Sequence, residues 1–507
     1  MATQPTYPGV YVEEVPSGNR TIVGVATSVT AFVGRTARGS VDEPVRCFSF
    51  GDFERQCGGL WADSDLGYAV YQFFQNGGAQ ALIARVATDA TTASLTLAGA
   101  EGASSFQVQA ANPGAWGENL RVTVSHGTIG ALDQTADTNT FHLTVYEVNP
   151  DEPDFDKSVR AREEHLHVSV DPEAPRYLGR ILEQRSSLLR LVAPSAARPV
   201  AVDRSPLLGG NDGSTGSLAD YDDAISRLET ADIINMVCVP PPVRDGDVNL
   251  ATLTTALAFC ERRRAVLLID PPSSWADYQD AADLAGLDSL RSANAAFYYP
   301  GIMAPDPLQE NRVRRFVPSG AVAGVIARTD GERGVWKAPA GADARVTNIS
   351  GLEVDLIDGE HGIANARGVN VLRHFSVVGP VVWGARTGRG ADELASEWKY
   401  LPVRRLALYI EESLYRGTRW AVFEPNDEPL WAQVRLAVGG FMQQLYRQGA
   451  FKGSKASDAY LVRCDSSTTT QADIDRGVVN VLVGFAPLKP AEFVVLQFQQ
   501  IAGQTSG

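Results

Sequence analysis

The sequence predicts an α/β protein of several domains, with a β-rich insertion and an α+β C-terminal domain. Its 507 residues exceed what one hydrophobic core normally holds, so we expect two to four domains. Strand-like and helix-like segments alternate strictly from 217 to about 300, which indicates a parallel sheet with helices on both faces. Residues 91–200 instead show short runs of alternating apolar and polar residues, which are typical of β-strands with one exposed face.

The first 23 residues are predicted to form an extended arm (1–23). Pro5, Pro8 and Pro16 exclude a helix there, and the β-branched residues around them favour strand pairing. The next segment, 24–90, is expected to be the first part of the α/β core. Within it we predict a strand, a helix that ends at two glycines, and a second strand, at 27–35, 65–78 and 80–86.

The β-rich insertion is predicted to span 91–200. Its strands correspond to SFQVQA, LRVTVSH and FHLTVYEV, and one helix is expected near 177–190. Acidic, proline-bearing segments such as NPDEPDFD separate the strands, and such segments suit solvent-exposed loops.

The α/β core is predicted to resume at 201–393. We expect alternating helices and strands there, the helices at 217–229, 250–264 and 274–287, and the strands at 232–239, 265–270 and 294–300. A further helix is expected at 318–330, with Ser319 as its N-cap.

The C-terminal domain, 394–507, is predicted to contain two long helices followed by two strands, near 403–417, 428–449, 478–485 and 492–499. The last strand, EFVVLQFQ, is apolar, β-branched and aromatic, and it follows a linker with two prolines. A strand-like segment at each end of a chain can add to the sheet of a neighbouring molecule, which is known as β-augmentation. We expect the interlocking arms to include Tyr11, Val12, Ile22, Val23, Phe493, Val494, Val495, Leu496 and Phe498.

Composition restricts the classes of function. The formal net charge is −15 at pH 7, and an acidic surface repels phosphate backbones, which argues against nucleic-acid binding. No run of 18 apolar residues is present, so no membrane insertion is expected, and the N-terminus lacks the features of a secretory signal. The five cysteines match neither a zinc site nor a disulfide framework, so we expect buried thiols in a reducing compartment.

An enzymatic alternative is an α/β serine hydrolase with Asp270, Ser319 and His361 as its candidate residues. Each has a simpler interpretation, because Asp270 precedes two prolines, Ser319 suits an N-cap, and His361 lies between two glycines. No GxSxG segment occurs, and the order Asp, Ser, His differs from the subtilisin order of Asp, His, Ser. No catalytic residue is therefore predicted.

No cofactor or metal site is predicted either. The glycine-rich loop 207–216 lacks the Lys-Ser/Thr pair of a P-loop, so we interpret it as a linker. His165 and His167 would share one face of a strand and could bind a metal, but no third ligand is evident.

Residues 430–455 contain no acidic residue, although the chain as a whole is acidic. One explanation is a surface helix with ordinary solvated charges. The other is a positive face that docks on an acidic partner. The candidate residues for such a contact are Arg435, Arg447, Lys452 and Lys455.

Several segments together resemble the contractile tail sheath family of phages and phage-like injection particles. PTYPGVYVEEVPSG at 5–18 is similar to the family's N-terminal signature, and PGAWGENLRVTV at 113–124 to a motif of its β insertion. LLGGNDGS at 207–214 resembles the start of its α/β domain. The sharpest similarity is VAGVIARTDGERGVWKAPAG at 322–341, followed by RRLALYIEESLYRGTRWAVFEPND at 404–427 and the terminal strands.

The resemblance implies an α/β core of subtilisin-like architecture without proteolysis, an outward-facing insertion, and a C-terminal domain completed by strands from neighbouring subunits. It implies a subunit that polymerises helically around an inner tube and contracts to drive that tube through a target cell envelope. The implied partners are further copies of the chain, the inner tube protein, and baseplate and terminal cap proteins. Such a particle, a phage tail or tail-like particle, is assembled in the bacterial cytoplasm. A serine hydrolase and a secreted adhesive surface module remain the alternatives.

Overall fold

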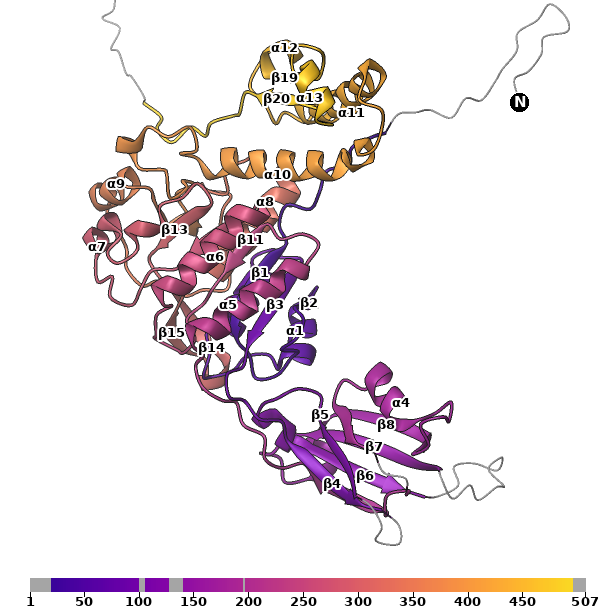
Figure 1. Cartoon of the computed structure of the whole chain (residues 1–507). Coiled ribbons are helices and arrows are strands. Elements are labelled where there is room, and N and C mark those ends of the chain that lie inside the picture. The colour runs from indigo at the N-terminus through magenta and orange to yellow at the C-terminus, as the bar shows by residue number, and fades with distance from the viewer. Residues whose placement is uncertain (1–19, 100–104, 127–139, 195–196, 496–507) are drawn as a thin grey trace, which may run out of the picture. The chain divides into compact units, whose positions relative to one another are not determined.

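The computed structural model describes residues 20–99, 105–126, 140–194 and 197–495 (Figure 1). The chain forms two compact units. We call the described residues 28–331 and 339–399 the body unit, and residues 20–27, 332–338 and 400–495 the terminal unit.

The body unit is built on a sheet of eight strands in the order β18-β17-β13-β12-β11-β1-β3-β2. The six central strands are parallel, and the two edge strands, β18 and β2, are antiparallel to their neighbours. The predicted parallel sheet is therefore present. Its strands are β1 (Thr30–Arg35), β2 (Val45–Cys47), β3 (Ala81–Val86), β11 (Met236–Cys238), β12 (Val266–Ile269), β13 (Ala295–Tyr299), β17 (Val369–Phe375) and β18 (Gly379–Val382).

Helices cover both faces of this sheet because its strands are apolar on both sides. Ala31 and Val33 of β1 belong to the core beneath α5 and α6 (Figure 1), whereas the ring of Phe32 contacts Phe73 of α2, with centroids 5.5 Å apart. The helices are α1 (Phe50–Cys57), α2 (Leu66–Gln75), α5 (Leu218–Arg227), α6 (Leu250–Arg263), α7 (Tyr278–Asp283), α8 (Ser319–Arg333) and α9 (Asp358–Ala366).

Helices α2 and α8 pack so closely that their backbones are in contact. A Cβ atom added to Gly320 of α8 would lie 2.1 Å from the carbonyl oxygen of Ala69, and one added to Gly324 would lie 2.5 Å from that of Phe73. Real Cβ atoms do not come this close to a backbone oxygen, so only glycine fits at either position.

The insertion contains two antiparallel sheets, in the orders β10-β6-β7-β8 and β4-β5-β9, which share one apolar core. The elements are β4 (Ser94–Ala98), β5 (Ser105–Ala110), β6 (Leu120–Ser125), β7 (Thr140–Val148), α3 (Phe155–Ser158), β8 (Val159–Ser169), α4 (Leu178–Arg185), β9 (Leu189–Ala193) and β10 (Val202–Pro206). A small sheet that the sequence did not predict also belongs to the body unit, with strands β14 (Ile302–Asp306), β15 (Arg312–Phe316) and β16 (Gly351–Leu352).

The terminal unit consists of two long helices and a small sheet of two strands. Helix α11 begins after Asp427, whose carboxylate accepts a hydrogen bond from the Leu430 amide, and its apolar residues recur every three or four positions. The helices and strands of the terminal unit are α10 (Leu401–Gly417), α11 (Glu428–Arg447), α12 (Ala456–Ala459), β19 (Tyr460–Arg463), α13 (Gln471–Asp475) and β20 (Leu482–Phe485). Residues 492–495 form no strand, and the rest of the predicted strand 492–499 lies outside the described residues.

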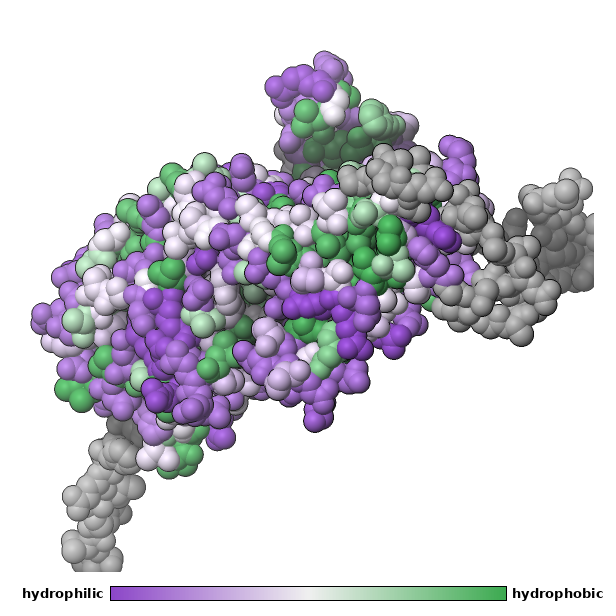
Figure 2. Space-filling model, turned by 90° about the horizontal axis from the view of Figure 1, so that it is seen from below, coloured by the Kyte–Doolittle hydropathy of each residue, from purple (hydrophilic) through white to green (hydrophobic). Residues whose placement is uncertain are grey.

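Hydrophobic residues occur in small, separate patches among hydrophilic ones on the face shown in Figure 2. Within the described ranges, no helix is both long enough and apolar enough to cross a bilayer. The five cysteines are buried.

Candidate assembly interface

The described end of the N-terminal arm is fixed to helix α10. Ile22 is 1% exposed, and a Cβ atom added to Gly417 of α10 would lie 2.5 Å from its Cγ2 atom. Further along, the Val25 amide donates a hydrogen bond to Ser413 Oγ, at 3.2 Å, and Arg405 donates one to the Thr27 carbonyl, at 2.9 Å. Ile22 is thus part of its own subunit's core, whereas the neighbouring Val23 is 77% exposed.

We expect Ile22→Ala to lower the free energy of unfolding of the terminal unit by about 2–5 kcal/mol, as for other buried Ile-to-Ala changes. Val23→Ala, one residue away and exposed, should change it by no more than about 0.5 kcal/mol. Thermal unfolding of both variants tests this, and equal midpoints would show that Ile22 does not anchor the arm.

Among the described residues, β19 and β20 form an antiparallel sheet of two strands. Each strand therefore has one edge that no other strand occupies among the described residues. Leu461 is 42% exposed and Leu482 is 51% exposed. A two-stranded sheet is marginally stable in water, and an open, apolar edge is a template for strands of another chain.

The described part of the C-terminal arm exposes three consecutive apolar side chains. Phe493, Val494 and Val495 are 75%, 80% and 79% exposed. Contiguous exposed apolar residues commonly mark an interaction site. The other predicted arm residues, Tyr11, Val12, Leu496 and Phe498, lie outside the described residues.

The four cations of the 430–455 stretch occupy different environments. Arg435 pairs with Glu428 at 2.7 Å and also donates to the Cys464 carbonyl, and the bond to Glu428 raises the pKa of this guanidinium. Arg447 is exposed at the end of α11, and Lys452 and Lys455 are exposed in the following loop. Three of the four side chains are therefore accessible, while Arg435 is used within the subunit.

The candidate catalytic residues do not form a triad. The structure brings Ser319 and Asp270 into direct contact, because the serine hydroxyl and amide donate to the two carboxylate oxygens, each at 2.7 Å. In a triad an imidazole stands between these groups, but a ring nitrogen of His361 lies 3.4 Å from an Arg373 guanidinium nitrogen. Because α8 includes Ser319, the prediction that Ser319 is its N-cap was wrong, and Asp270 from the end of β12 binds the first amide instead.

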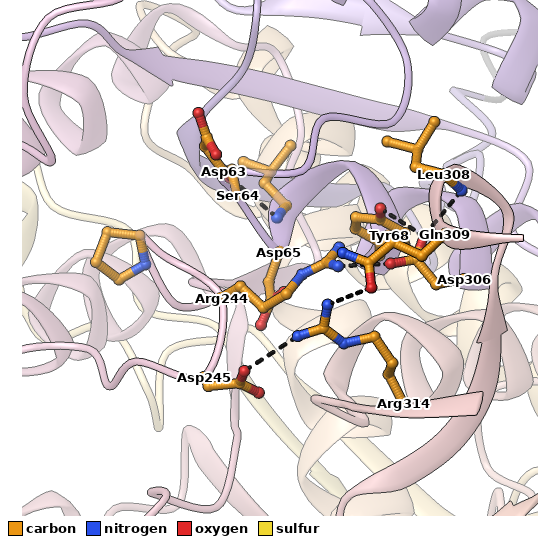
Figure 3. A network of polar contacts seen from close by, with 12 residues as sticks. Asp63, Ser64, Asp65, Tyr68, Arg244, Asp245, Asp306, Leu308, Gln309 and Arg314 are labelled. Atoms are coloured by element: carbon orange, nitrogen blue, oxygen red, sulfur yellow. Dashed lines mark hydrogen bonds and ion pairs between the residues drawn. The ribbon is translucent and has the colours of Figure 1, made fainter. Parts of the chain in front are cut away.

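A network of polar side chains surrounds Arg244, which follows β11 on the side of the sheet where α/β folds commonly bind ligands (Figure 3). Arg244, from the loop after β11, binds Asp306 at 2.5 Å, and Tyr68 of α2 donates to the same carboxylate at 2.8 Å. The rings of Tyr68 and Phe316 stack at 4.8 Å. These contacts hold strands β14 and β15 against the sheet.

Asp65 of this network is a buried carboxylate without a hydrogen bond to one of its oxygens. It is 4% exposed, Oδ1 accepts no hydrogen bond from the described residues, and the Arg244 Nε atom is 4.0 Å away. Burial raises the pKa of Asp65 to about 7 from its ordinary 3.8.

A raised pKa has a defined effect on stability. Between about pH 4 and pH 7 the folded chain keeps the Asp65 proton and the unfolded chain loses it, so stability falls as the pH rises. We expect Asp65→Asn to raise the free energy of unfolding at pH 8 by up to about 4 kcal/mol, at about 1.4 kcal/mol per pKa unit, and to have little effect at pH 4. Thermal midpoints at both pH values measure this. The exposed Asp151→Asn is the control, and the same gain for Asp65→Asn at both pH values would contradict the assignment.

The structure does not bring the histidines together as a metal site. His165 and His167 would share a face only if side chains alternated regularly along β8. A bulge between β7 and β8 and the left-handed backbone of His167 (φ 49°) interrupt this alternation. His165 lies 3.4 Å from Glu163, and the His167 amide donates to the ring of His142. No group of three or more potential metal ligands occurs in the described part of the chain.

Comparison of the sequence with known proteins identifies one family. The model described as phage tail sheath protein central domain matches residues 216–388, and the phage tail sheath C-terminal domain matches residues 394–501. Together they cover more than half of the chain. A prophage major tail sheath protein of Pseudomonas aeruginosa is 25% identical over 256 residues, which are 50% of this chain and 61% of that protein. The tail sheath protein of Enterobacteria phage T4 is 25% identical over 37% of this chain and 28% of its own length.

Solved structures show the same fold. The sheath complex of an extracellular contractile injection system, PVC, in its contracted state has a TM-score of 0.59 at 24% identity, with 98% of both chains covered. A sheath tail protein from Listeria innocua has a TM-score of 0.63 at 15% identity and covers 92% of this chain and 96% of that one. The chain therefore belongs to the contractile tail sheath family, the family of sheath components of phage tails and tail-like particles.

Proposed function

We propose that this chain is a structural subunit that polymerises helically around an inner tube and contracts to drive the tube through a target cell envelope. The observation that carries this proposal is the open two-stranded sheet β19–β20 in the same unit as an exposed apolar C-terminal segment. Each subunit thus carries both an acceptor for a strand and a segment suited to be donated. Donor and acceptor are different surfaces, so their contacts are heterologous, and heterologous contacts whose rotation does not close produce a helical filament.

Strand donation explains how subunits can stay connected while they move. A ladder hydrogen bond contributes only about 0.5–1.5 kcal/mol net, but several bonds act together. Covering Leu461 and Leu482 and burying Phe493 to Val495 add hydrophobic stabilisation at about 25 cal/mol per Å². The joint persists while the proline-bearing linker before Phe493 bends, and the extended polymer is then a kinetically trapped state.

The role is non-enzymatic in this proposal. The contact between Asp270 and Ser319 holds the beginning of α8, and Arg244, which follows β11, is bound to Asp306. The partners are further copies of the chain, an inner tube protein, and baseplate and terminal cap proteins. The similar solved structures of a baseplate and of a sheath complex support self-assembly and association with a baseplate. The particle is assembled in the bacterial cytoplasm in this proposal.

Electron microscopy of the purified chain tests the proposal directly. We expect tubes with helical order, either alone or when the chain is produced with its tube protein. A chain that remains monomeric under both conditions, at high concentration, would contradict a sheath function.

We expect the double charge reversal Lys452→Glu and Lys455→Glu to weaken contact with the tube while the subunit stays folded. Both side chains are exposed, and an exposed ion pair contributes about 0.2–1 kcal/mol, so tube binding per subunit should fall several-fold at low salt. The difference should shrink at high salt because salt screens exposed charges.

A matched control reverses two exposed cations of the body unit, Arg55 and Lys157, and thus changes the net charge equally. Co-sedimentation of sheath with tube measures binding for all three proteins. Equal binding by the two double variants at both salt concentrations would exclude an electrostatic role of Lys452 and Lys455.

A further inference from the structure

The outward face of helix α11 lacks the charges of an ordinary solvent-facing helix. Gln433, Leu436, Gly440 and Gln444 follow one another at a spacing of three or four residues, so they lie in one stripe, and each is exposed. Leu436 is 62% exposed. The stripe has no charged residue before Arg447, although surface helices normally carry their charged residues on this side.

A groove of about 210 Å³ lies along this stripe. Its walls include Trp420, Phe441 and Leu436, and Arg20 stacks on the Trp420 ring at 4.3 Å. Gly440 leaves space in the groove, because a Cβ atom added there would meet no atom within 4 Å. The groove is thus open and lined partly by apolar and aromatic side chains, and its size suits one large apolar side chain.

The loop between α10 and α11 presents such a side chain. Phe423 is fully exposed, and its backbone is left-handed, with a φ of 68°. A left-handed backbone is an outlier for a bulky residue, and an exposed phenyl ring forgoes the hydrophobic gain of burial. Val422 beside it is 63% exposed. Two unfavourable features at one residue indicate that the ring has a partner in the assembled state.

The charges around the two surfaces are complementary. Between Phe423 and the start of α11 the loop carries Glu424 and Asp427 and no basic residue, although Arg419 precedes the ring. The groove, by contrast, is lined by Arg20 and by residues of the acid-free 430–455 stretch. Within one subunit the Glu424 carboxylate lies 3.8 Å from the guanidinium of the exposed Arg20, at the rim of the groove. An acidic loop with an apolar tip therefore matches a neutral-to-basic groove on an identical chain.

We propose that Phe423 of one subunit inserts into the α11 groove of a second copy, as an intersubunit contact additional to the donated strands. This inference rests on the proposed function, because it adds a second contact to the same polymer. The inserted ring and the receiving groove are different surfaces, so the contact is heterologous, which is the type of contact that a helical polymer repeats.

Two neighbouring glycines provide a matched test. Gly440→Leu fills the groove, whereas Gly439→Leu adds the same side chain one residue away, at a glycine that also has open space around it and does not line the groove. Replacing glycine in a helix favours folding, so both subunits should remain at least as thermostable as the wild type. We expect Gly440→Leu to raise the critical concentration for tube formation tenfold or more and Gly439→Leu to leave it near the wild-type value. Equal behaviour of the two variants would overturn the proposal.

The donor side is tested by Phe423→Ala, with Val377→Ala as the control because Val377 is 90% exposed in the body unit. We expect only Phe423→Ala to impair assembly.

Mixing Phe423→Cys with Gly440→Cys subunits under mild oxidation should give a dimer that neither variant gives alone. Absence of the mixed dimer, from tube-forming subunits, would overturn the contact while leaving strand donation intact. If deletion of the C-terminal arm abolished tubes while Phe423→Ala formed normal tubes, strand donation would stand and the Phe423 contact would be overturned.

Discussion

Deletion of residues 492–507 should leave a folded, monomeric subunit that no longer forms tubes. The described residues in this segment contribute little to their own subunit, because Phe493, Val494 and Val495 are 75–80% exposed. The Tyr400 hydroxyl donates a long hydrogen bond, 3.4 Å, to a carboxylate oxygen of Glu492. Upstream, the bridge between Phe451 and Pro487 remains in the truncated chain. Removing these exposed side chains should therefore cost little folding stability.

The effect on assembly should instead be complete. If the segment supplies a strand to β19–β20 of a neighbour, its loss removes a ladder and a buried apolar face from every joint of the polymer. Electron microscopy and sedimentation velocity distinguish monomers from tubes. Deletion of 501–507 alone is the control, since it spares the apolar run EFVVLQFQ. Normal tubes from the longer deletion would refute strand donation by this arm.

The variant Gly320→Val should be the most destabilising single substitution in the body unit that we predict. Its Cβ atom would overlap the carbonyl oxygen of Ala69, which belongs to the backbone of α2 and cannot rotate away. Overpacking of a core costs about 1–3 kcal/mol and occasionally more, and two helix backbones must separate here. We expect a loss of at least about 3 kcal/mol.

Helix α8 supplies its own control for this prediction. A Cβ atom added to Gly331, three turns later in the same helix, meets nothing within 4 Å. Gly331→Ala should therefore stabilise the chain by about 0.4–1 kcal/mol through the lower entropy of the unfolded state. Thermal unfolding compares the two variants. Similar losses for both would show that glycine is needed in α8 for a reason other than its contact with α2.

Local pattern was sufficient for much of the fold. The parallel sheet follows from continuous apolar strands such as AVLLID between amphipathic helices, and helices α10 and α11 follow from their apolar spacing. The ends of short elements were less predictable. Helix α7 was expected at 274–287 but spans Tyr278–Asp283, because Asp277 and Asp280 form a capping box at its start and Leu284 adopts a left-handed backbone at its end.

The strands β14, β15 and β19 were not predicted because their sequences, IMAPD, RVRRF and YLVR, show no clear alternation of polar and apolar residues. Arg244 and Tyr68 hold Asp306 of β14 from loops and helices distant in sequence. A side chain whose partner is more than 60 residues away gives no local signal. The same reason explains why Asp270 and Ser319 were recognised separately but not as a hydrogen-bonded pair.

The sequence by itself determined the family and the alternation of the core, and it indicated an apolar C-terminal segment, since these depend on order and spacing along the chain. Only the tertiary structure decided that Ile22 is buried within its own subunit, that Arg435 is paired with Glu428, and that Phe423 is exposed in the same unit as an open groove. Burial and pairing depend on which distant segments meet. Sequence spacing specifies the face of an element on which a residue lies, but the packing of other elements decides whether that face is covered.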